Sequence, residues 1–390
     1  MMDPNVLAGV RVVDFSWVLA GPMATKMLAA MGAEVIKIES GARPEHVQRY
    51  PWSAVVNAGK LSCTINLGKP EGQALIRRLV GISDLVVENF SAGVLAKHGL
   101  GYAALREIRP DLIFVSASGT GREGPQRDAL AYGTLLQAYS GRAGMIATPN
   151  PQLEAMGILP AWTDPITALW EACAILAAIR HRRCTGEGAF IDLSMLESTV
   201  ALLPESLFRE ALGSGGAAPG GNRDPSAVPS GCFRCAGIDS WLVLSVCDDT
   251  EWMALCAAME RDDLAADPRF QDGPGRAAHR AILEAETAAW LASQTAEVAE
   301  ARLQAAGVPA ARSRHIGDVV EDPHFVRRGL FPELADGSRT IALPWQTDDG
   351  WRGDFRPPPA LGADNDYVFR TLLGLDTPEI DRLTEAEVLV

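Results

Sequence analysis

LPAWTDPITALWEACAILAAIRHRRCTGEGAFIDLSMLES, residues 159–198, is the stretch that decides the fold. Asp164 followed by Pro165 marks a helix start, because Asp is a favourable N-cap and Pro suits the first helical position. Apolar residues then recur at helical spacing. The sequence TGEG at residues 185–188 predicts a tight turn, and we expect a second apolar helix to begin near Ile191.

Asp164 has two possible roles. It could be a structural N-cap, which is the commoner use of an Asp before a helix. It could also be a nucleophilic carboxylate, because a helix N-terminus stabilises the ionised form and Asp can form covalent intermediates. The two roles are compatible. The approach through Trp162 is apolar, so we expect the carboxylate to be partly desolvated.

The composition argues against several classes of protein. At 390 residues, the chain is long enough for two domains with full cores. A net charge of −14 argues against a nucleic-acid partner, because phosphates require a basic face. Seven cysteines at irregular spacing indicate reduced thiols and a cytoplasmic location. We expect no signal peptide, because residues 1–11 lack a basic region followed by an apolar core, and no membrane span, because no run of 18 apolar residues occurs.

The N-terminal segment predicts a βαβ unit. Residues 10–15 predict a buried strand, residues 23–31 a helix ended by Gly32, and residues 33–38 the next strand. The turn after the first strand would present backbone N–H groups at a helix start, a natural anion site. Further strands are predicted at residues 61–67, 84–88 and 112–116. The fold class is therefore α/β.

Two motifs are rejected as cofactor or metal sites. Residues 119–124 match G-x-G-x-x-G, but Pro125 interrupts the helix that should follow and the motif comes after the fifth strand. Cys232 and Cys235 form a C-x-x-C pair without a second pair at zinc spacing. We expect neither a nicotinamide cofactor nor a metal.

The segment that begins at Asp164 resembles the core signature of the class III CoA-transferases, a family that also includes the α-methylacyl-CoA racemases. The shared pattern is an Asp, an Ala-rich helix, a Thr-Gly-x-Gly turn and Asp-x-Ser-x-x-Glu. It is carried by Asp164, residues 180–183, Thr185, Gly186, Gly188, Asp192, Ser194 and Glu197. The resemblance runs over nearly the whole chain, and it implies that Asp164 is the nucleophile of a CoA transfer.

The resemblance also implies a coenzyme A site, lined in part by the loop at residues 16–22. Leu19 stands where formyl-CoA transferases carry Gln, which disfavours formate or oxalate and favours a more apolar acyl group. The expected CoA-binding residues are Val18, Leu19, Ala20, Ser40, Ile65, Asn66, Leu67, Asn89, Phe90, Lys97, His98 and Tyr132. The CoA phosphates would be held by Arg43, Lys60 or Lys97, and the sequence leaves this choice open.

A Gly- and Pro-rich stretch at residues 213–230 divides the chain. It is an interdomain linker, an active-site loop as the resemblance implies, or both. Its expected active-site glycines are Gly215, Gly216, Gly220 and Gly221. Residues 1–212 and 332–390 are expected to form a large Rossmann-like CoA-binding domain, and residues 231–331 a smaller α+β domain. Strands beyond the stretch are predicted at residues 231–235, 241–246, 308–312 and 340–343. The resemblance further implies an interlaced homodimer.

The function implied is transfer of CoA from an acyl-CoA donor to a free carboxylic acid. Asp164 would form a mixed anhydride with the donor acyl group and then an aspartyl–CoA thioester. Coenzyme A takes part as a substrate, and no metal is needed. The pair Tyr132 and Gly133 is similar to relatives that handle bulky hydrophobic acids, so the hypothesis is a succinyl-CoA donor with such an acceptor.

Two alternatives remain. An acyl-CoA racemase of the same superfamily is disfavoured, because Tyr132 and Gly133 stand where racemases carry the His and Asp that move the α-proton. A catalytically inactive CoA-binding paralogue is the other alternative, against which the intact Asp164 argues.

Overall fold

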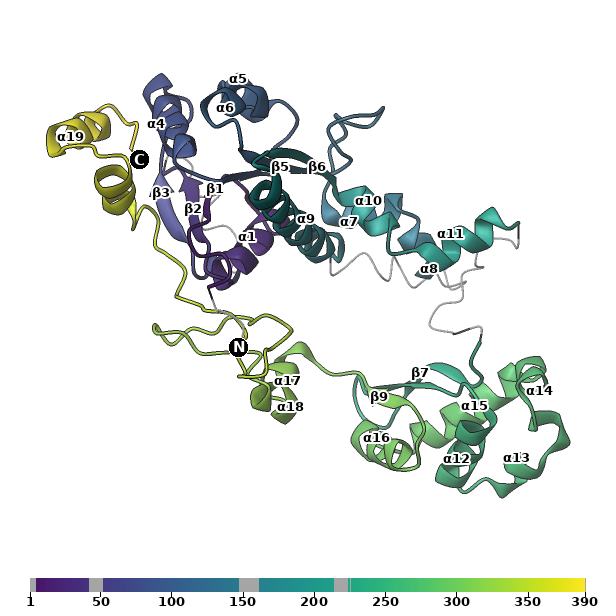
Figure 1. The fold of residues 1–390 in the computed structure, drawn as a ribbon. Coiled ribbons are helices and arrows are strands. Elements are labelled where there is room, and N and C mark those ends of the chain that lie inside the picture. The colour runs from purple at the N-terminus through teal and green to yellow at the C-terminus, as the bar shows by residue number, and fades with distance from the viewer. Residues whose placement is uncertain (1–4, 42–51, 147–160, 214–223, 225, 390) are drawn as a thin grey trace. The chain divides into compact units, whose positions relative to one another are not determined.

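The structure, a computed structural model, describes residues 5–41, 52–146, 161–213, 224 and 226–389 (Figure 1). The chain forms two compact units. The first comprises Met1–Arg142, Ile158–Pro204 and Pro323–Val390, and the second comprises Ala143–Gly157 and Glu205–Asp322. Residue 332, the predicted point of return to the large domain, lies within the last segment of the first unit.

The first unit is built on a six-stranded parallel sheet. Its strand order is β3-β2-β1-β4-β5-β6, which is that of a doubly wound Rossmann fold. The strands are β1 Arg11–Asp14, β2 Glu34–Glu39, β3 Leu61–Thr64, β4 Leu85–Glu88, β5 Ile113–Ser118 and β6 Ala189–Ser194. All neighbouring pairs are parallel. The predicted α/β class is confirmed.

Helices cover both faces of this sheet (Figure 1). Successive strand residues point to opposite faces, and Val12 and Val13 of β1 are both fully buried. Val13 belongs to the apolar cluster that includes α4 Pro70–Gly81 and α6 Tyr102–Ile108. Val12 belongs to the cluster that includes α1 Ala20–Ala30 and α9 Thr163–Thr185. The helix at Asp164 therefore packs against the same sheet as the predicted βαβ unit.

The prediction of a second helix near Ile191 is wrong, because this segment is the edge strand β6. Side chains along β6 alternate between half-buried and exposed up to Leu193, which is the period of a strand. Helix α10 Met195–Val200 begins only after Ser194, whose hydroxyl accepts a hydrogen bond from the Glu197 N–H. A Cβ at Gly188 would lie 2.2 Å from the Leu112 carbonyl oxygen. Glycine at this position therefore lets the chain enter the sheet beside β5.

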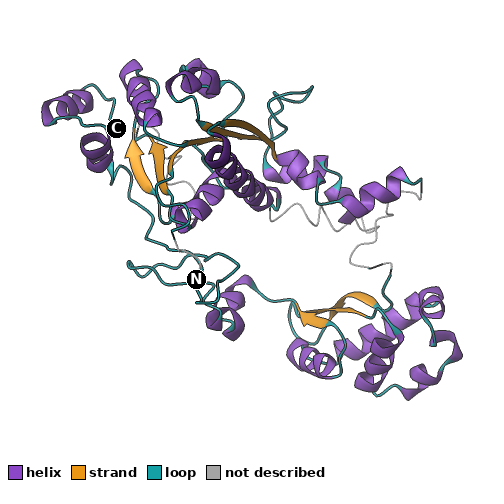
Figure 2. Ribbon diagram, viewed as in Figure 1, coloured by secondary structure: helices purple, strands orange, loops and turns teal. Residues whose placement is uncertain are grey.

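The second unit contains a three-stranded antiparallel sheet of order β7-β8-β9 (Figure 2). Its strands are β7 Ser230–Arg234, β8 Trp241–Ser245 and β9 Ala310–Arg312. Helices α12 Asp249–Met259, α15 Arg280–Ala292 and α16 Ala296–Ala305 share its apolar core. The strands predicted at residues 231–235 and 241–246 are confirmed, and they pair with each other in antiparallel fashion. The strand predicted at residues 340–343 is wrong, since that part of the described chain has only an isolated bridge between Glu333 and Arg339.

The remaining helices are short. They are α3 Ser53–Asn57, α5 Val94–Lys97, α7 Gly133–Tyr139, α8 Arg142–Ile146, α11 Pro204–Ala211, α13 Asp262–Ala266, α14 Gly273–Ala278, α17 Ile316–Val320, α18 Pro323–Arg327 and α19 Thr377–Glu385, with a 3-10 turn at Pro268–Phe270 and a π-helix at Tyr367–Leu372. Val368 and Phe369 of the π-helix join the cluster that covers β1 and β2. The C-terminal segment is thus part of the core of the first unit.

Candidate active site

The carboxyl edge of the parallel sheet gathers many of the predicted binding residues. β1 and β4 are neighbours in the sheet, and the strand order reverses direction between them. Doubly wound folds bind ligands in the crevice at this point. The loop after β1 carries Val18 and Leu19, and the loop after β4 carries Asn89 and Phe90. Ser40 follows β2 at the same edge.

Asn89 joins the loop after β4 to the loop after β1. Its side-chain nitrogen donates to the Trp17 carbonyl oxygen at 2.8 Å, and its oxygen accepts from the Trp17 N–H at 2.9 Å. Val18, the next residue, has a φ of 64°, which is a costly conformation for a β-branched side chain. A Cβ at Gly21 would lie 2.4 Å from the Ser16 Cβ. The loop that enters α1 is therefore held in a strained conformation by contacts on both sides.

A buried ion pair lies beside this loop. Lys60 Nζ lies 2.9 Å from Asp14 Oδ2, and neither side chain is exposed. Asp14 also accepts from the Ser16 N–H at 2.8 Å and from the Thr25 hydroxyl at 2.7 Å. Burial acts to raise the pKa of Asp14, but Lys60 and Lys37 bring the pKa below its ordinary value. Burial lowers the pKa of Lys60 to about 8, although Asp14 opposes this shift.

The three cations expected to hold the CoA phosphates, Arg43, Lys60 and Lys97, differ in how the structure places them. Lys60 is enclosed and bound to Asp14, so it does not offer its charge at the surface. Lys97 is exposed at the end of α5. Arg43 lies outside the described residues.

Gln73 of α4 connects two of the expected CoA-binding residues, although the sequence did not single it out. It donates to the Leu67 carbonyl oxygen at 3.0 Å and lies 3.4 Å from Nδ1 of His98. Asn66 accepts from the Gly68 N–H at 2.9 Å, and Ile65 is buried. The ends of β3 and α5 are thereby brought together at the edge of the sheet.

Arg122 is the other residue of this edge that the sequence did not single out. It lies 2.8 Å from Glu88, and it donates to the Phe90 carbonyl oxygen at 2.8 Å and to the Ser116 hydroxyl at 2.6 Å. Its backbone N–H donates to Asp192 at 2.8 Å. Burial raises the pKa of Glu88, and Arg122 opposes the rise. The signal available in the sequence was an Arg in the loop after β5, together with an acidic residue on each of the neighbouring strands β4 and β6.

Asp164 lies in the first turn of α9, so its prediction as the N-cap is wrong. The N-cap is Trp162, whose side chain makes no capping bond. The Thr163 hydroxyl donates to the Gly133 carbonyl oxygen at 3.1 Å, which places the start of α9 against the start of α7. Burial raises the pKa of Asp164 to about 6, opposed by its own backbone N–H. Asp164 is therefore mostly ionised at neutral pH, but less stable in that form than an exposed Asp.

The remaining predicted residues are Tyr132 and the four glycines of the expected active-site loop. Tyr132 is the N-cap of α7, and its side chain is 71% exposed. The four glycines expected in the active-site loop, Gly215, Gly216, Gly220 and Gly221, lie outside the described residues.

Glu171 is a buried carboxyl about two turns beyond Asp164 on α9. Its side chain is fully buried, and neither carboxyl oxygen has a hydrogen-bond partner among the described residues. Burial raises its pKa to about 8, with a further rise from Asp14 and an opposing effect from Lys60. Glu171 therefore stays largely protonated at neutral pH.

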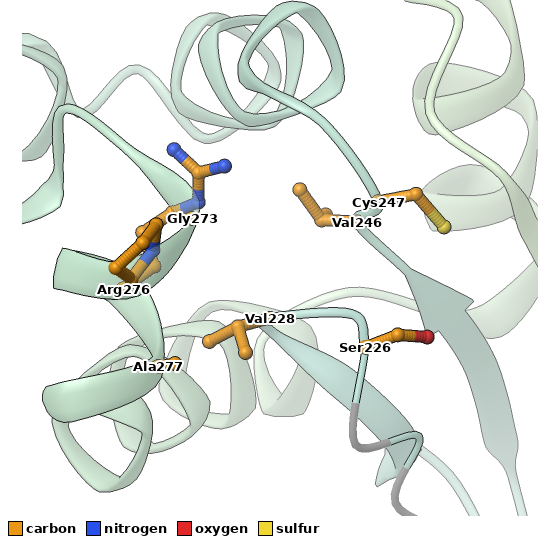
Figure 3. A pocket seen from close by; sticks show the side chains of 8 residues that line it. Ser226, Val228, Val246, Cys247, Gly273, Arg276 and Ala277 are labelled. Carbon is orange, nitrogen blue, oxygen red and sulfur yellow. The ribbon is translucent and has the colours of Figure 1, made fainter.

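The second unit has a cavity of its own, of about 230 Å³ (Figure 3). Val228 and Val246 contribute apolar lining, and the buried Arg276 beside it pairs with Asp249 at 2.7 Å. No described residue of the predicted site lines this cavity.

Within the described ranges no cluster of three or more His, Cys, Asp or Glu could hold a metal ion. None of the described helices has the length and apolar character needed to cross a membrane.

Comparison with known proteins decides the family. The family model described as CoA-transferase family III matches residues 7–365. The chain belongs to CoA-transferase family III. The resemblance carried by the segment around Asp164 is confirmed, and the protein is an enzyme of this class.

Similar proteins include other CoA-transferases. Succinyl-CoA–D-citramalate CoA-transferase of Chloroflexus aurantiacus is 33% identical over 99% of this chain and 98% of that protein. Succinyl-CoA:mesaconate CoA-transferase of Haloarcula marismortui is 35% identical over 87% of this chain and 89% of that protein. The crystal structure of a CaiB/BaiF family protein from Brucella suis matches with a TM-score of 0.85 at 29% identity, over 94% of this chain and 99% of that one.

For this CoA-transferase, we expect Arg122→Lys to weaken CoA binding roughly tenfold. Lysine keeps a positive charge near Glu88, but it cannot bond Glu88, Ser116 and the Phe90 carbonyl together as the guanidinium does. Calorimetric titration with CoA would measure the change. Arg127→Lys is the matched control, because Arg127 is exposed and pairs only with Asp128 in the described structure. Equal CoA affinity in Arg122→Lys and the wild type would contradict a role of Arg122 in holding the CoA-binding loops in place.

We expect Glu171→Gln to stabilise the transferase, and to do so more strongly as the pH rises. The unfolded chain releases the Glu171 proton near the ordinary pKa of 4.5, whereas the folded chain holds it to about 8. Raising the pH between these values therefore favours unfolding of the wild type. The gain should be small near about pH 5 and reach on the order of a few kcal/mol near about pH 8. Urea unfolding at both pH values would measure this gain in the free energy of unfolding. A gain that does not change with pH would show that the folded wild type does not hold Glu171 in its protonated form.

Proposed function

We propose that this CoA-transferase moves CoA from succinyl-CoA to a short dicarboxylic acid, with Asp164 as the covalent nucleophile. The observation that carries the proposal is the position of Asp164. It is a partly buried carboxylate in the first turn of the 23-residue helix α9, with a pKa of about 6 that no cation among the described residues perturbs. A carboxylate that is ionised but not neutralised by a partner is free to attack a thioester.

The proposed reaction has four steps. The Asp164 carboxylate attacks the thioester carbonyl of the donor, the C–S bond breaks, and CoA leaves as a thiolate from an aspartyl mixed anhydride. The thiolate then attacks the aspartyl carbonyl, which gives an aspartyl–CoA thioester and releases the donor acid. The acceptor carboxylate displaces CoA thiolate from Asp164 to form a second mixed anhydride. The thiolate finally attacks the acceptor carbonyl, which yields the new CoA thioester and restores the Asp164 carboxylate.

The carboxyl edge of the sheet, at the loops after β1 and β4, is proposed to hold coenzyme A. The hydrogen bonds of Asn89 with Trp17 and of Arg122 with Phe90 support this assignment, because they hold both loops in place. We propose Lys97 as the cation for the CoA phosphates. In its favour, Lys97 is exposed at this edge, whereas Lys60 is enclosed in its pair with Asp14. The first unit carries every described residue proposed for the site.

The names of the relatives support the choice of donor and acceptor. Both transferases compared above are named for succinyl-CoA, and their partners, citramalate and mesaconate, are short dicarboxylic acids. This acceptor class differs from the bulky hydrophobic acid suggested by Tyr132 and Gly133. A panel that contains both kinds of acid would separate the two.

A homodimer in the cytoplasm is also proposed. The outer face of α9 exposes Leu169, Trp170 and Leu176, and α11 exposes Leu207 and Phe208. Apolar side chains gathered on one helix face favour burial against a partner, and a second copy of the chain is the partner that the family resemblance implies. The seven cysteines are all free thiols, which suits a reducing compartment.

We expect Asp164→Asn to lower CoA transfer from succinyl-CoA by at least about 1,000-fold, because the covalent route is lost. Turnover would be measured by chromatography with citramalate, mesaconate and a bulky aromatic acid as acceptors. The wild-type rate should fall as the pH drops through about 6, since protonation removes the nucleophile. Asp128→Asn, at an exposed Asp, is the control.

Full activity in Asp164→Asn would exclude the covalent mechanism. Solvent deuterium appearing at the α-carbon of an acyl-CoA, without transfer of CoA, would indicate a racemase instead. Binding of CoA with no reaction in any donor and acceptor pair would indicate an inactive paralogue.

A further inference from the structure

Gly133 is a glycine that its own backbone does not require. It is the first residue of α7, and its φ is not in the positive range that favours glycine. Alanine is more favourable than glycine in a helix. The reason for a glycine must therefore lie in what surrounds this position.

The neighbour that a side chain would meet is Asp164. A Cβ at Gly133 would lie 2.0 Å from Oδ2 of Asp164 and 3.2 Å from its Cγ. It would also lie 3.2 Å from the Cβ of Ala161. The Asp164 carboxylate thus occupies the space that the first atom of any side chain at position 133 would need.

The two helices cannot easily separate to make room. Thr163 is fully buried, and its hydroxyl donates to the carbonyl oxygen of Gly133 itself at 3.1 Å. The backbone next to Asp164 is therefore tied to the residue that would carry the new side chain. A methyl group at position 133 would be accommodated mainly by rotation of the Asp164 side chain.

We infer that Gly133 is a positioning residue, which holds the Asp164 carboxylate in its reactive orientation by leaving the space in which that carboxylate lies. This inference rests on the proposed role of Asp164 as nucleophile. Covalent attack requires the reacting atoms in near-attack geometry, and a misplacement of about 1 Å can cost on the order of a hundredfold in rate. Position 133 therefore controls the rate of acylation without touching the substrate.

The first experiment compares Gly133→Ala with the wild type. The rate of acyl transfer from saturating succinyl-CoA to Asp164 would be followed by rapid quenching and mass spectrometry of the intact protein. We expect a fall of about 10- to 100-fold, with CoA affinity changed less than about twofold, since position 133 does not bind CoA in this account. The acid limb of the rate should also move to lower pH, because a carboxylate pushed out of its buried position is easier to ionise.

Gly144→Ala is the matched control. Gly144 also lies in a short helix, α8, and a Cβ there would meet no atom of the described residues within 4 Å. This variant should acylate at the wild-type rate. Wild-type acylation in Gly133→Ala, with an unchanged pH profile, would overturn the inference.

A second experiment tests the contact without relying on activity. The stability cost of Gly133→Ala is measured by urea unfolding in the wild type and again in an Asp164→Ala background. If the carboxylate is the obstacle, the substitution destabilises the wild type but is neutral or stabilising in the Asp164→Ala background. An equal cost in both backgrounds would overturn the inference. A wild type that never forms an acyl adduct would instead refute the proposed function, while this comparison would still measure the contact.

Discussion

The buried ion pair between Asp14 and Lys60 is the interaction on which the site depends. Two charges withdrawn from water are costly, and their attraction compensates only where further hydrogen bonds complete the arrangement. Ser16 and Thr25 supply those bonds to Asp14. The end of β1, the loop that follows it and helix α1 are therefore joined through one carboxylate. Trp17 of this loop is in turn hydrogen-bonded to Asn89, the residue that follows β4.

The first unit places its acidic side chains in different environments, and this sets their chemistry. Asp14 is neutralised by a lysine, and Glu88 is bound by Arg122. Glu171 is buried without a hydrogen-bond partner among the described residues, and it remains protonated. Asp164 is buried enough for its pKa to rise, but no cation of the described part of the chain neutralises it. In a chain with a net charge of −14, the proposed nucleophile is thus distinguished by its surroundings rather than by its residue type.

The sequence predicted five of the six strands of the parallel sheet, because short β-rich runs punctuated by Gly report local structure. It mistook β6 for a helix, since a short apolar run such as 189–194 suits either element and only pairing with β5 decides between them. It predicted Asp164 as the N-cap, whereas helix α9 begins at Thr163 and Trp162 is the N-cap. The N-cap is set by where the helical hydrogen bonds begin, which residue preferences alone do not fix. Enclosure of Lys60 and the links made by Arg122 arise from segments far apart in the chain. Local patterns could not reveal them, nor the approach of Gly133 to Asp164.

The most direct test of covalent catalysis by Asp164 follows the oxygen atoms. The transferase would turn over succinyl-CoA with an acceptor acid whose carboxylate carries heavy oxygen, and the peptide containing Asp164 would then be weighed by mass spectrometry. Each cycle of the proposed reaction leaves one acceptor oxygen in the aspartyl carboxylate and passes one aspartyl oxygen to the released succinate. Heavy oxygen is therefore expected in Asp164 and, after further cycles, in succinate. Full turnover with no label in either would contradict the proposed reaction, because CoA would then have passed between the acids without a bond to the enzyme.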